Sequence, residues 1–319
     1  MMMMMTMMKL AVLGLAVVVM VEPCMGTTAT TYGMVSSCCS VSVIDVATTE
    51  TVCHNIPPPA FSGLIAPTSM SAAPGFFSYM GQNGVWIHIE LPTHAGDPCK
   101  VTNSTLSGGS LLPPGSFLAA VAPHTSDVGF YAAWSDPPAP PTGEEGGAEM
   151  VYGRVYVPTG SLLSSLKTPL SRDNASPVLS GVFDQGPDQF LFTFRMEDGS
   201  GSRIVNMGKN MVYALEGGVG INEVVIKGLA VADKVVLAGA VVDNGPAYVA
   251  QVEFAGKGTF SLTHWASLAS PSDHPVGSGI IEGSTYYAAT PDGELLTCQQ
   301  HQQCGVTSIH NRLITVFSA

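Results

Sequence analysis

The seven residues Val85-Trp86-Ile87-His88-Ile89-Glu90-Leu91 decide the fold class. Apolar side chains alternate with Trp86, His88 and Glu90 along the whole stretch. Successive side chains of a strand point to opposite faces, so this spacing buries one face of a β-strand and fits no helix. Residues 189–195 repeat the alternation, with aromatic rings at every second position. The sequence therefore predicts an all-β protein.

Strands of this kind recur as hairpins. Five segments combine a short apolar strand, a turn and a second strand with an aromatic residue, and they begin at Phe76, Phe117, Val178, Val236 and Val276. The aromatic residues are Trp86, Tyr131, Phe190, Tyr248 and Tyr286. The hairpins start 41, 61, 58 and 40 residues apart, which is near the length of a propeller blade, about 40–50 residues, with insertions in the middle two. We therefore expect a β-propeller of about six blades with these rings at equivalent positions, and a β-sandwich or another all-β fold is the alternative.

The segment Ser40-Val-Ser-Val-Ile-Asp-Val-Ala-Thr-Thr-Glu-Thr-Val52 resembles the repeat of bacterial-type β-propellers named for a Tyr-Val-Thr-Asn motif. Those repeats join a Val-Ser-Val-Ile-Asp strand to a second Val-rich strand through a Thr-rich turn. The resemblance covers one hairpin, and the tyrosine-led opening strand of the repeat is missing. It implies that this hairpin lacks inner strands of its own. The C-terminal segment 309–318, with Leu313–Phe317, is then expected to supply one and to close the ring, which leaves no exposed sheet edge.

The N-terminus has the pattern of a secretory signal. One basic residue, Lys9, precedes an apolar run of 12 residues, Leu10–Val21. This run is shorter than the roughly 20 residues that a bilayer-spanning helix needs, and it matches the apolar region of a signal peptide. Cys24 and Gly26 are small enough for a cleavage site. Residues 1–26 are therefore predicted to be a signal peptide and residues 27–319 a single β-propeller-like domain that is secreted or extracellular, with an uncleaved signal anchor as the alternative.

The cysteine count supports export. Six cysteines follow the predicted cleavage site: Cys38, Cys39, Cys53, Cys99, Cys298 and Cys304. An even number in an exported chain predicts three disulfides, and the sequence alone leaves their pairing open. Cys298 and Cys304 enclose so few residues that they are able to close a local loop. The adjacent Cys38 and Cys39 are expected to face different partners.

Composition excludes several classes of protein. The 319 residues include 12 Lys and Arg against 24 Asp and Glu, a net charge of −12, and only 11% are charged while 46% are hydrophobic. This apolar bias excludes a charged disordered chain, and the few basic residues exclude binding to a nucleic-acid backbone as the main task. Every apolar run after the N-terminus is interrupted by Gly, Pro or a polar residue, so we expect no membrane span in the mature chain.

Surface features are predicted at three places. Asn103 and Asn174 begin glycosylation sequons, although Pro177 disfavours the second. Residues 136–148 form a loop rich in Pro, Gly and Glu. Propellers bind ligands through loops, so this loop is a candidate contact region for an extracellular protein or a glycan.

Two patterns have the residue types of a chemical site. Trp86, His88 and Glu90 share one strand face, which fits an acid–base site on a sugar cleft. A solvated face or a face between blades has the same pattern and is the preferred interpretation, since no sequence feature marks a cleft. Cys298, His301 and Cys304 have a spacing that suits zinc, but in an oxidising compartment the cysteines more often form a disulfide.

The remaining polar pairs are isolated. His264-Trp265 and Asp273-His274 have no third partner in the sequence, and the motifs of serine hydrolases, zinc proteases and nucleotide-binding proteins are missing. We therefore assign no catalytic, cofactor-binding or metal-binding residue.

These patterns favour a secreted or cell-surface β-propeller that serves as a binding or structural module. The alternative is an exported hydrolase or lactonase-like enzyme, because the resembled repeat family is related in architecture to sugar-lactone hydrolases. The two functions differ at the mouth of the central channel, where an enzyme is expected to gather Asp, Glu, His or Asn side chains.

Overall fold

The computed structural model describes the strands and many of their connections. The described residues are 30–36, 41–56, 70–73, 76–80, 85–92, 97–105, 117–123, 129–135, 149–156, 161–171, 175–184, 189–196, 201–206, 209, 211–216, 224–232, 234–242 and 245–318. The signal peptide predicted at residues 1–26, the loop at 136–148, Cys38, Cys39 and Asn174 lie outside them.

The described strands form six antiparallel groups of four. The first group contains both ends of the described chain: β24(Arg312–Ser318), β1(Thr31–Ser36), β2(Val41–Asp45) and β3(Thr51–Ile56). The second contains β4(Met70–Ala73), β5(Phe76–Met80), β6(Val85–Glu90) and β7(Lys100–Thr105). The third contains β8(Phe117–Pro123), β9(Gly129–Ser135), β10(Glu149–Tyr156) and β11(Ser161–Ser171).

The other three groups are joined into one twelve-stranded sheet. They are β12(Ala175–Asp184), β13(Gln189–Met196), β14(Ser202–Asn206) and β15(Met211–Leu215); β16(Val224–Ala232), β17(Val235–Val242), β18(Ala247–Ala255) and β19(Thr259–Ser267); and β20(Val276–Glu282), β21(Thr285–Ala289), β22(Leu295–Gln299) and β23(Gly305–Thr307). Short parallel contacts of β15 with β19 and of β16 with β20 make the joins. A 3₁₀ turn, η3(Pro271–Asp273), links β19 to β20.

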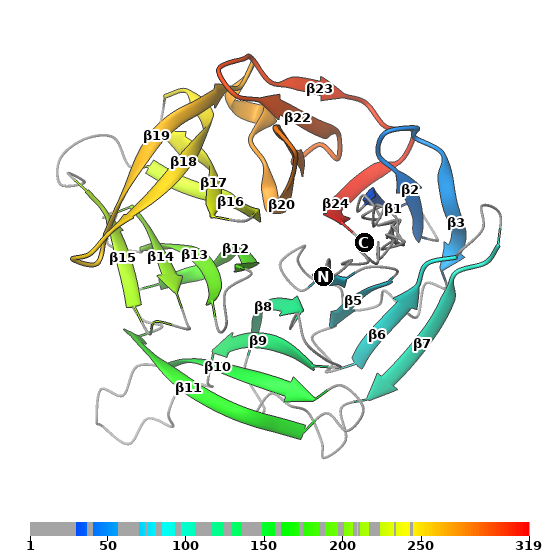
Figure 1. Ribbon diagram of the computed structural model, residues 1–319, viewed down its shortest axis with the longest axis horizontal. Helices are drawn as coiled ribbons and strands as arrows, with labels where there is room; N and C mark the ends of the chain where they lie inside the picture. Colours follow the sequence, from blue (N-terminus) through cyan, green and yellow to red (C-terminus); the bar gives the residue numbers. More distant parts are fainter. Residues whose placement is uncertain are drawn as a thin grey trace, which may run out of the picture.

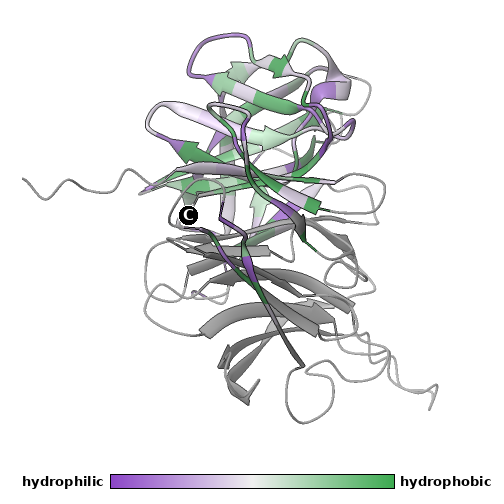
Figure 2. Cartoon of the chain, turned by 90° about the vertical axis from the view of Figure 1, so that its right-hand side faces the viewer, coloured by the Kyte–Doolittle hydropathy of each residue, from purple (hydrophilic) through white to green (hydrophobic). Residues whose placement is uncertain are grey.

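The groups stand around a common centre, and the fold is a β-propeller (Figure 1). The first strands β8, β12, β16 and β20 lie toward the centre, and the last strands β11, β15, β19 and β23 lie toward the rim. Figure 2 shows apolar residues along the described strands and hydrophilic residues in many of the turns.

Packing explains why a ring forms and a two-layer sandwich does not. In β17, Val236 and Ala238 belong to a core shared with the β12–β15 group, and Leu237 belongs to a core shared with the β20–β23 group. Both faces of this strand are therefore buried against neighbours, whereas a strand of a sandwich has one face in water. The continuous apolar sequence VVLAGAVV supplies both faces. The sandwich alternative is wrong.

The first group closes the ring, as the sequence predicts. Strand β24 pairs with β1 in antiparallel register, with Tyr32 opposite Phe317 and Gly33 opposite Val316. Met34 packs toward Ile89 of β6, and Val35 packs toward the β20–β23 group. One expectation needs correction: the N-terminal hairpin does have an inner strand of its own, because residues 31–36 form β1 between β24 and β2.

The predicted position of the hairpins within their groups is also wrong for two of the five. The five hairpins exist, but those at Phe76 and Val236 begin at the second strand of their groups, β5 and β17, while the others begin at the first strand. Tyr248 consequently lies in a third strand and Tyr286 in a second strand. The groups actually begin at Met70, Phe117, Ala175, Val224 and Val276, which are 47, 58, 49 and 52 residues apart. The error arises because β16 and β17 are apolar neighbours joined by a short turn, so the sequence does not mark which comes first.

Two disulfides fasten the described part of the ring. Cys53 at β3 is bonded to Cys99 before β7, with Cα atoms 5.6 Å apart, and this bond links the outer edges of the first and second groups. Cys298 is bonded to Cys304 and closes the turn between β22 and β23. The sequence left the pairing of the cysteines open, and the local bond between Cys298 and Cys304 is one of the pairings it allowed.

Candidate functional site

A pocket of about 280 Å³ lies between the β16–β19 group and the β20–β23 group. Its lining comes from strands β16 to β20 and from the turns after β20 and β22: Ala232, Val235, Leu237, Gln251, Trp265, Ile281, Gly283, Ser284 and Gln300. We call these nine residues the inter-sheet pocket. None of their side chains is ionisable, although the chain carries a net charge of −12.

The pocket is apolar inside and polar at its rim. Leu237 is fully buried and Trp265 is only 6% exposed, while Ser284 and Gln300 are exposed and Gln251 is partly buried. Val235 is 37% exposed and is a large apolar residue at the surface of the described part of the chain. A concave apolar surface with a few polar groups is typical of small-molecule sites.

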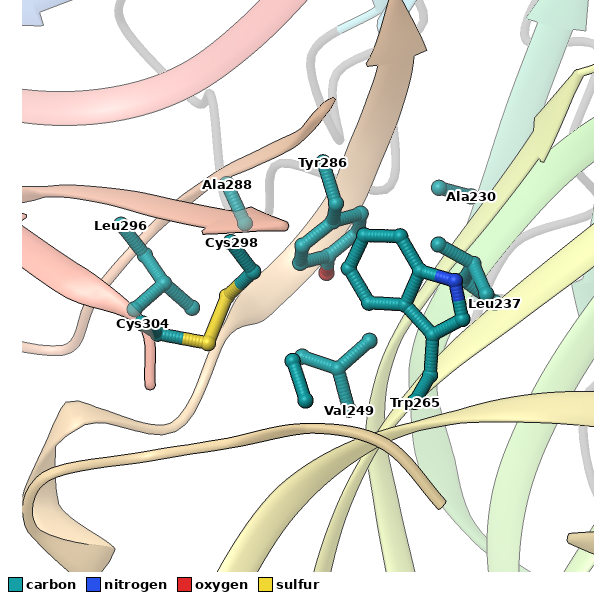
Figure 3. Packing of buried hydrophobic residues seen from close by; sticks show 10 residues of the cluster. Ala230, Leu237, Val249, Trp265, Tyr286, Ala288, Leu296, Cys298 and Cys304 are labelled. Atoms are coloured by element: carbon teal, nitrogen blue, oxygen red, sulfur yellow. A yellow bond between two sulfur atoms is a disulfide. The ribbon is translucent and has the colours of Figure 1, made fainter. Parts of the chain in front are cut away.

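A β-bulge places Trp265 at the pocket. Val249 pairs with Ala266 and Ala250 pairs with His264, so Trp265 is the extra residue of β19. Its indole packs among Leu237, Val249 and Tyr286, with the ring nitrogen on the side of Leu237 and away from the disulfide (Figure 3). The sequence gives no sign of this bulge.

The disulfide-closed turn is fixed to the end of β19. The backbone N–H of His301 donates to the Trp265 carbonyl at 2.7 Å, and that of Cys304 donates to the Ser267 carbonyl at 2.8 Å. The N–H of Ser267 donates in return to the Gln302 carbonyl at 3.2 Å. We call residues 298–304 the clasp. Because Gln300 belongs to it, the clasp holds one wall of the pocket against the strand that supplies Trp265.

The disulfide of the clasp argues against the zinc site considered for Cys298, His301 and Cys304. Both cysteines are buried and oxidised to a disulfide, so neither is a thiolate ligand. Among the described residues, no group of three or more His, Cys, Asp or Glu side chains is placed to hold a metal ion.

Behind the pocket, the Tyr286 hydroxyl is buried without a hydrogen-bond partner in the described part of the structure. The residue is fully buried beside Trp265 and the disulfide (Figure 3). Burial raises the pKa of its phenol far above the usual 10, because the phenolate is disfavoured away from water. This hydroxyl stays protonated at every physiological pH.

The same bulge creates a serine–histidine contact. His264 and Ser267 are three residues apart and would point to opposite faces of a regular strand. The extra residue Trp265 returns them to one face, where the His264 Nε2 lies 3.0 Å from the Ser267 Oγ. The ring of Tyr248 lies 5.9 Å from that of His264. The sequence showed His264 only as a member of an isolated pair, because its partner depends on the bulge.

His274 follows η3 at the entry to β20. Its Nδ1 is buried without a partner among the described groups. Burial is the largest cause and lowers the pKa of the imidazole, and the charge of Lys227 also lowers it, while an interaction with the residue's own backbone and the charge of Asp273 act in the opposite direction. Asp273 completes a capping box with Ser270 at η3, so its role is local.

Of the acid–base candidates of β6, the structure places all three by backbone register and describes the side chain of Glu90. Trp86 and His88 lie in β6 opposite Met80 and Ser78. Glu90 accepts a hydrogen bond from Lys100 at 2.9 Å in an exposed ion pair, an arrangement that contributes little to stability. Asn103 lies in β7 opposite Ile87.

No protein-family model and no curated protein matches this sequence. Among solved structures, a chain of the nidogen/laminin complex is similar with a TM-score of 0.49 at 10% identity, over 90% of this chain and 97% of that one. Apo AztD from Citrobacter koseri has a TM-score of 0.42 at 13% identity over 88% and 82% of the two chains. The β-propeller domain of Cps50 (Swd1) from Myceliophteria thermophila has 0.40 at 11% over 87% and 79%. At this level of similarity the fold argument rests on the sheets and cores of this chain itself.

Proposed function

We propose that this protein is an exported β-propeller of six blades that works as a binding module, with the inter-sheet pocket as its ligand site. The observation that carries the proposal is the pocket held between two sheets by the clasp. A site that is already rigid before binding loses little conformational entropy when a ligand enters. The ring, closed by its own terminal strands, provides that rigidity.

Export is supported by two kinds of observation. Disulfides persist in oxidising compartments, and two are present in the described part of the chain. The pattern of residues 1–26 is that of a signal peptide. Among the described residues, no helix has the length and apolarity needed to span a bilayer.

Paired glutamine variants test the binding site. Gln300 lines the pocket, whereas its neighbour Gln299 is also exposed but does not line it. The labelled mature chain is applied to an array of neutral glycans and to an array of synthetic peptides. We expect at least one bound spot that Gln299→Ala retains and Gln300→Ala loses. If no spot binds, or if Gln300→Ala retains every spot, the pocket is not the ligand site.

An exported hydrolase is the second candidate, and the contact between His264 and Ser267 favours it. A serine hydroxyl hydrogen-bonded to an imidazole is the nucleophile–base pair of many acyl hydrolases. The test is hydrolysis of p-nitrophenyl esters and of a sugar lactone by the mature chain. Turnover that Ser267→Ala abolishes and Ser261→Ala preserves would favour the enzyme, and the absence of turnover would reject it.

A further inference from the structure

We infer that the inter-sheet pocket binds a neutral polyhydroxylated ring, namely a single pyranose residue of a glycan. This inference rests on the proposed binding function and specifies its ligand. It is carried by three properties of the pocket: the absence of charge in its lining, the kind of hydrogen-bonding groups that it offers, and its size.

The lining excludes a charged ligand. All nine residues are neutral, and an ion buried among them would lose hydration without gaining an opposite charge. The chain is acidic overall, so it also repels anions at long range. Sugar acids and phosphorylated ligands are therefore disfavoured.

The polar groups suit hydroxyls. The amides of Gln251 and Gln300 and the hydroxyl of Ser284 make no side-chain hydrogen bond within the described part of the structure, and each offers both a donor and an acceptor. The Trp265 indole adds one donor, and its nitrogen lies on the side of Leu237, which also lines the pocket (Figure 3). A sugar hydroxyl donates and accepts at once, so a single ring is able to satisfy all four groups.

The size suits one ring. A water molecule takes up about 30 Å³ in the liquid, so a pocket of about 280 Å³ has the space of roughly nine water molecules. A pyranose ring with its ring substituents fits this space, with one edge left at the rim. Longer glycans would continue outward past the exposed Ser284 and Gln300.

A peptide fits less well. Extended peptides usually bind by adding a strand to a free sheet edge. Beside the pocket that edge is occupied, because Ser267 at the end of β19 bridges to Gln303 and accepts from the N–H of Cys304.

The test is an NMR titration of the mature chain with methyl glycosides of glucose, galactose, mannose and N-acetylglucosamine. Glucuronate and N-acetyl-tryptophanamide are the charged and peptide probes. We expect one or more glycosides to shift the side-chain amide signals of Gln251 and Gln300 with a millimolar Kd, as befits a ligand of about a dozen atoms. Glucuronate is expected to bind at least tenfold more weakly.

Two variants assign the contacts. Trp265→Phe keeps an aromatic ring and removes the N–H, and Gln300→Ala alters only an exposed turn residue, so the fold is preserved in at least the second. Both should weaken glycoside binding about tenfold, while Gln299→Ala leaves it unchanged. Shifts of the two amides by N-acetyl-tryptophanamide alone would overturn the sugar inference and leave the binding function standing. No shift with any probe up to 50 mM, or glycoside binding that Gln300→Ala leaves intact, would also overturn it.

Discussion

Tyr286 buries a phenol hydroxyl in an apolar core where it has no described partner. A buried polar group without a hydrogen bond destabilises the folded state, since it gives up its bond to water. Tyr286→Phe removes the hydroxyl and keeps the ring. We expect it to raise the free energy of unfolding by about 1 kcal/mol, as measured by chemical denaturation.

Tyr287 is the matched control, because it lies on the opposite face of the same strand and is partly exposed. Tyr287→Phe should change stability by less than about 0.5 kcal/mol. A destabilised Tyr286→Phe variant would mean that the hydroxyl has a partner.

Gly239 permits a close approach between two groups. A Cβ at this position would lie 1.9 Å from the Cγ of Pro275, in the segment that leads into β20. Gly239→Ala should therefore cost about 1–3 kcal/mol through overpacking, seen as a lower Tm. Gly256→Ala is the control, since nothing lies within 4 Å of its Cβ. Equal Tm values for the two variants would contradict the packing at Pro275.

His274 makes stability depend on pH. Its folded-state pKa is lowered, so the folded protein binds a proton less readily than the unfolded chain. The contribution of the neutral imidazole is present above the unfolded pKa of about 6.5 and is lost as pH falls below it. Between pH 7 and pH 5, the Tm of the wild type should fall by more than the Tm of His274→Gln. A difference independent of pH would refute the buried neutral state.

The side-chain orientations of Trp265 and Ser267 could not be derived from the alternation of the sequence. Alternation identifies a strand, but one unpaired residue reverses every side chain beyond it. The sequence therefore could not place Trp265 in the pocket or Ser267 beside His264. The disulfide between Cys298 and Cys304 was foreseeable as a local loop, because its geometry depends on only a few residues.

At the scale of elements, the clasp and the first group are each fastened by a disulfide. The bonded cysteines are 6 residues apart in the clasp and 46 residues apart between β3 and β7. In the chain-entropy account, a longer closed loop restricts the unfolded state more. Removal of the pair Cys298/Cys304 by serine substitutions should cost about 2 kcal/mol, and removal of Cys53/Cys99 about 4 kcal/mol, in denaturant titrations.

Loss of the Cys298–Cys304 disulfide should also weaken the hydrogen bonds between the clasp and β19. We expect faster amide exchange at His301 and Cys304 in Cys298→Ser/Cys304→Ser, because these N–H groups hold the turn against β19. Unchanged exchange there would show that the turn docks without its disulfide.

Among the elements, the main difference from the sequence-based expectation is the position of two hairpins within their groups. Alternation alone predicts β5 and β17 as first strands, since β4 is short and β16 is joined to β17 by a brief turn. Hairpins are local and can be recognised from alternation, whereas the position of a hairpin within a group is set by contacts with other groups.

At the scale of the whole molecule, the ring was predictable because both of its requirements are visible in the sequence. Apolar strands such as Val235–Val242 need neighbours on both faces, and a spare strand at Leu313–Phe317 was available to close the circle. The pocket was not predictable, since strand residues of one group and strand and turn residues of the next group form it together.

Closure of the ring by β24 and β1 is the central claim, and amide hydrogen exchange tests it most directly. In the full chain, residues 31–36 and 312–318 should be protected to the level of the central strand β17, because their pairing buries Phe317, Leu313 and Met34. In a chain that ends at residue 311, protection of residues 31–36 should be lost. Rapid exchange of 312–318 in the full chain, or protection of 31–36 that survives the truncation, would contradict the closed ring.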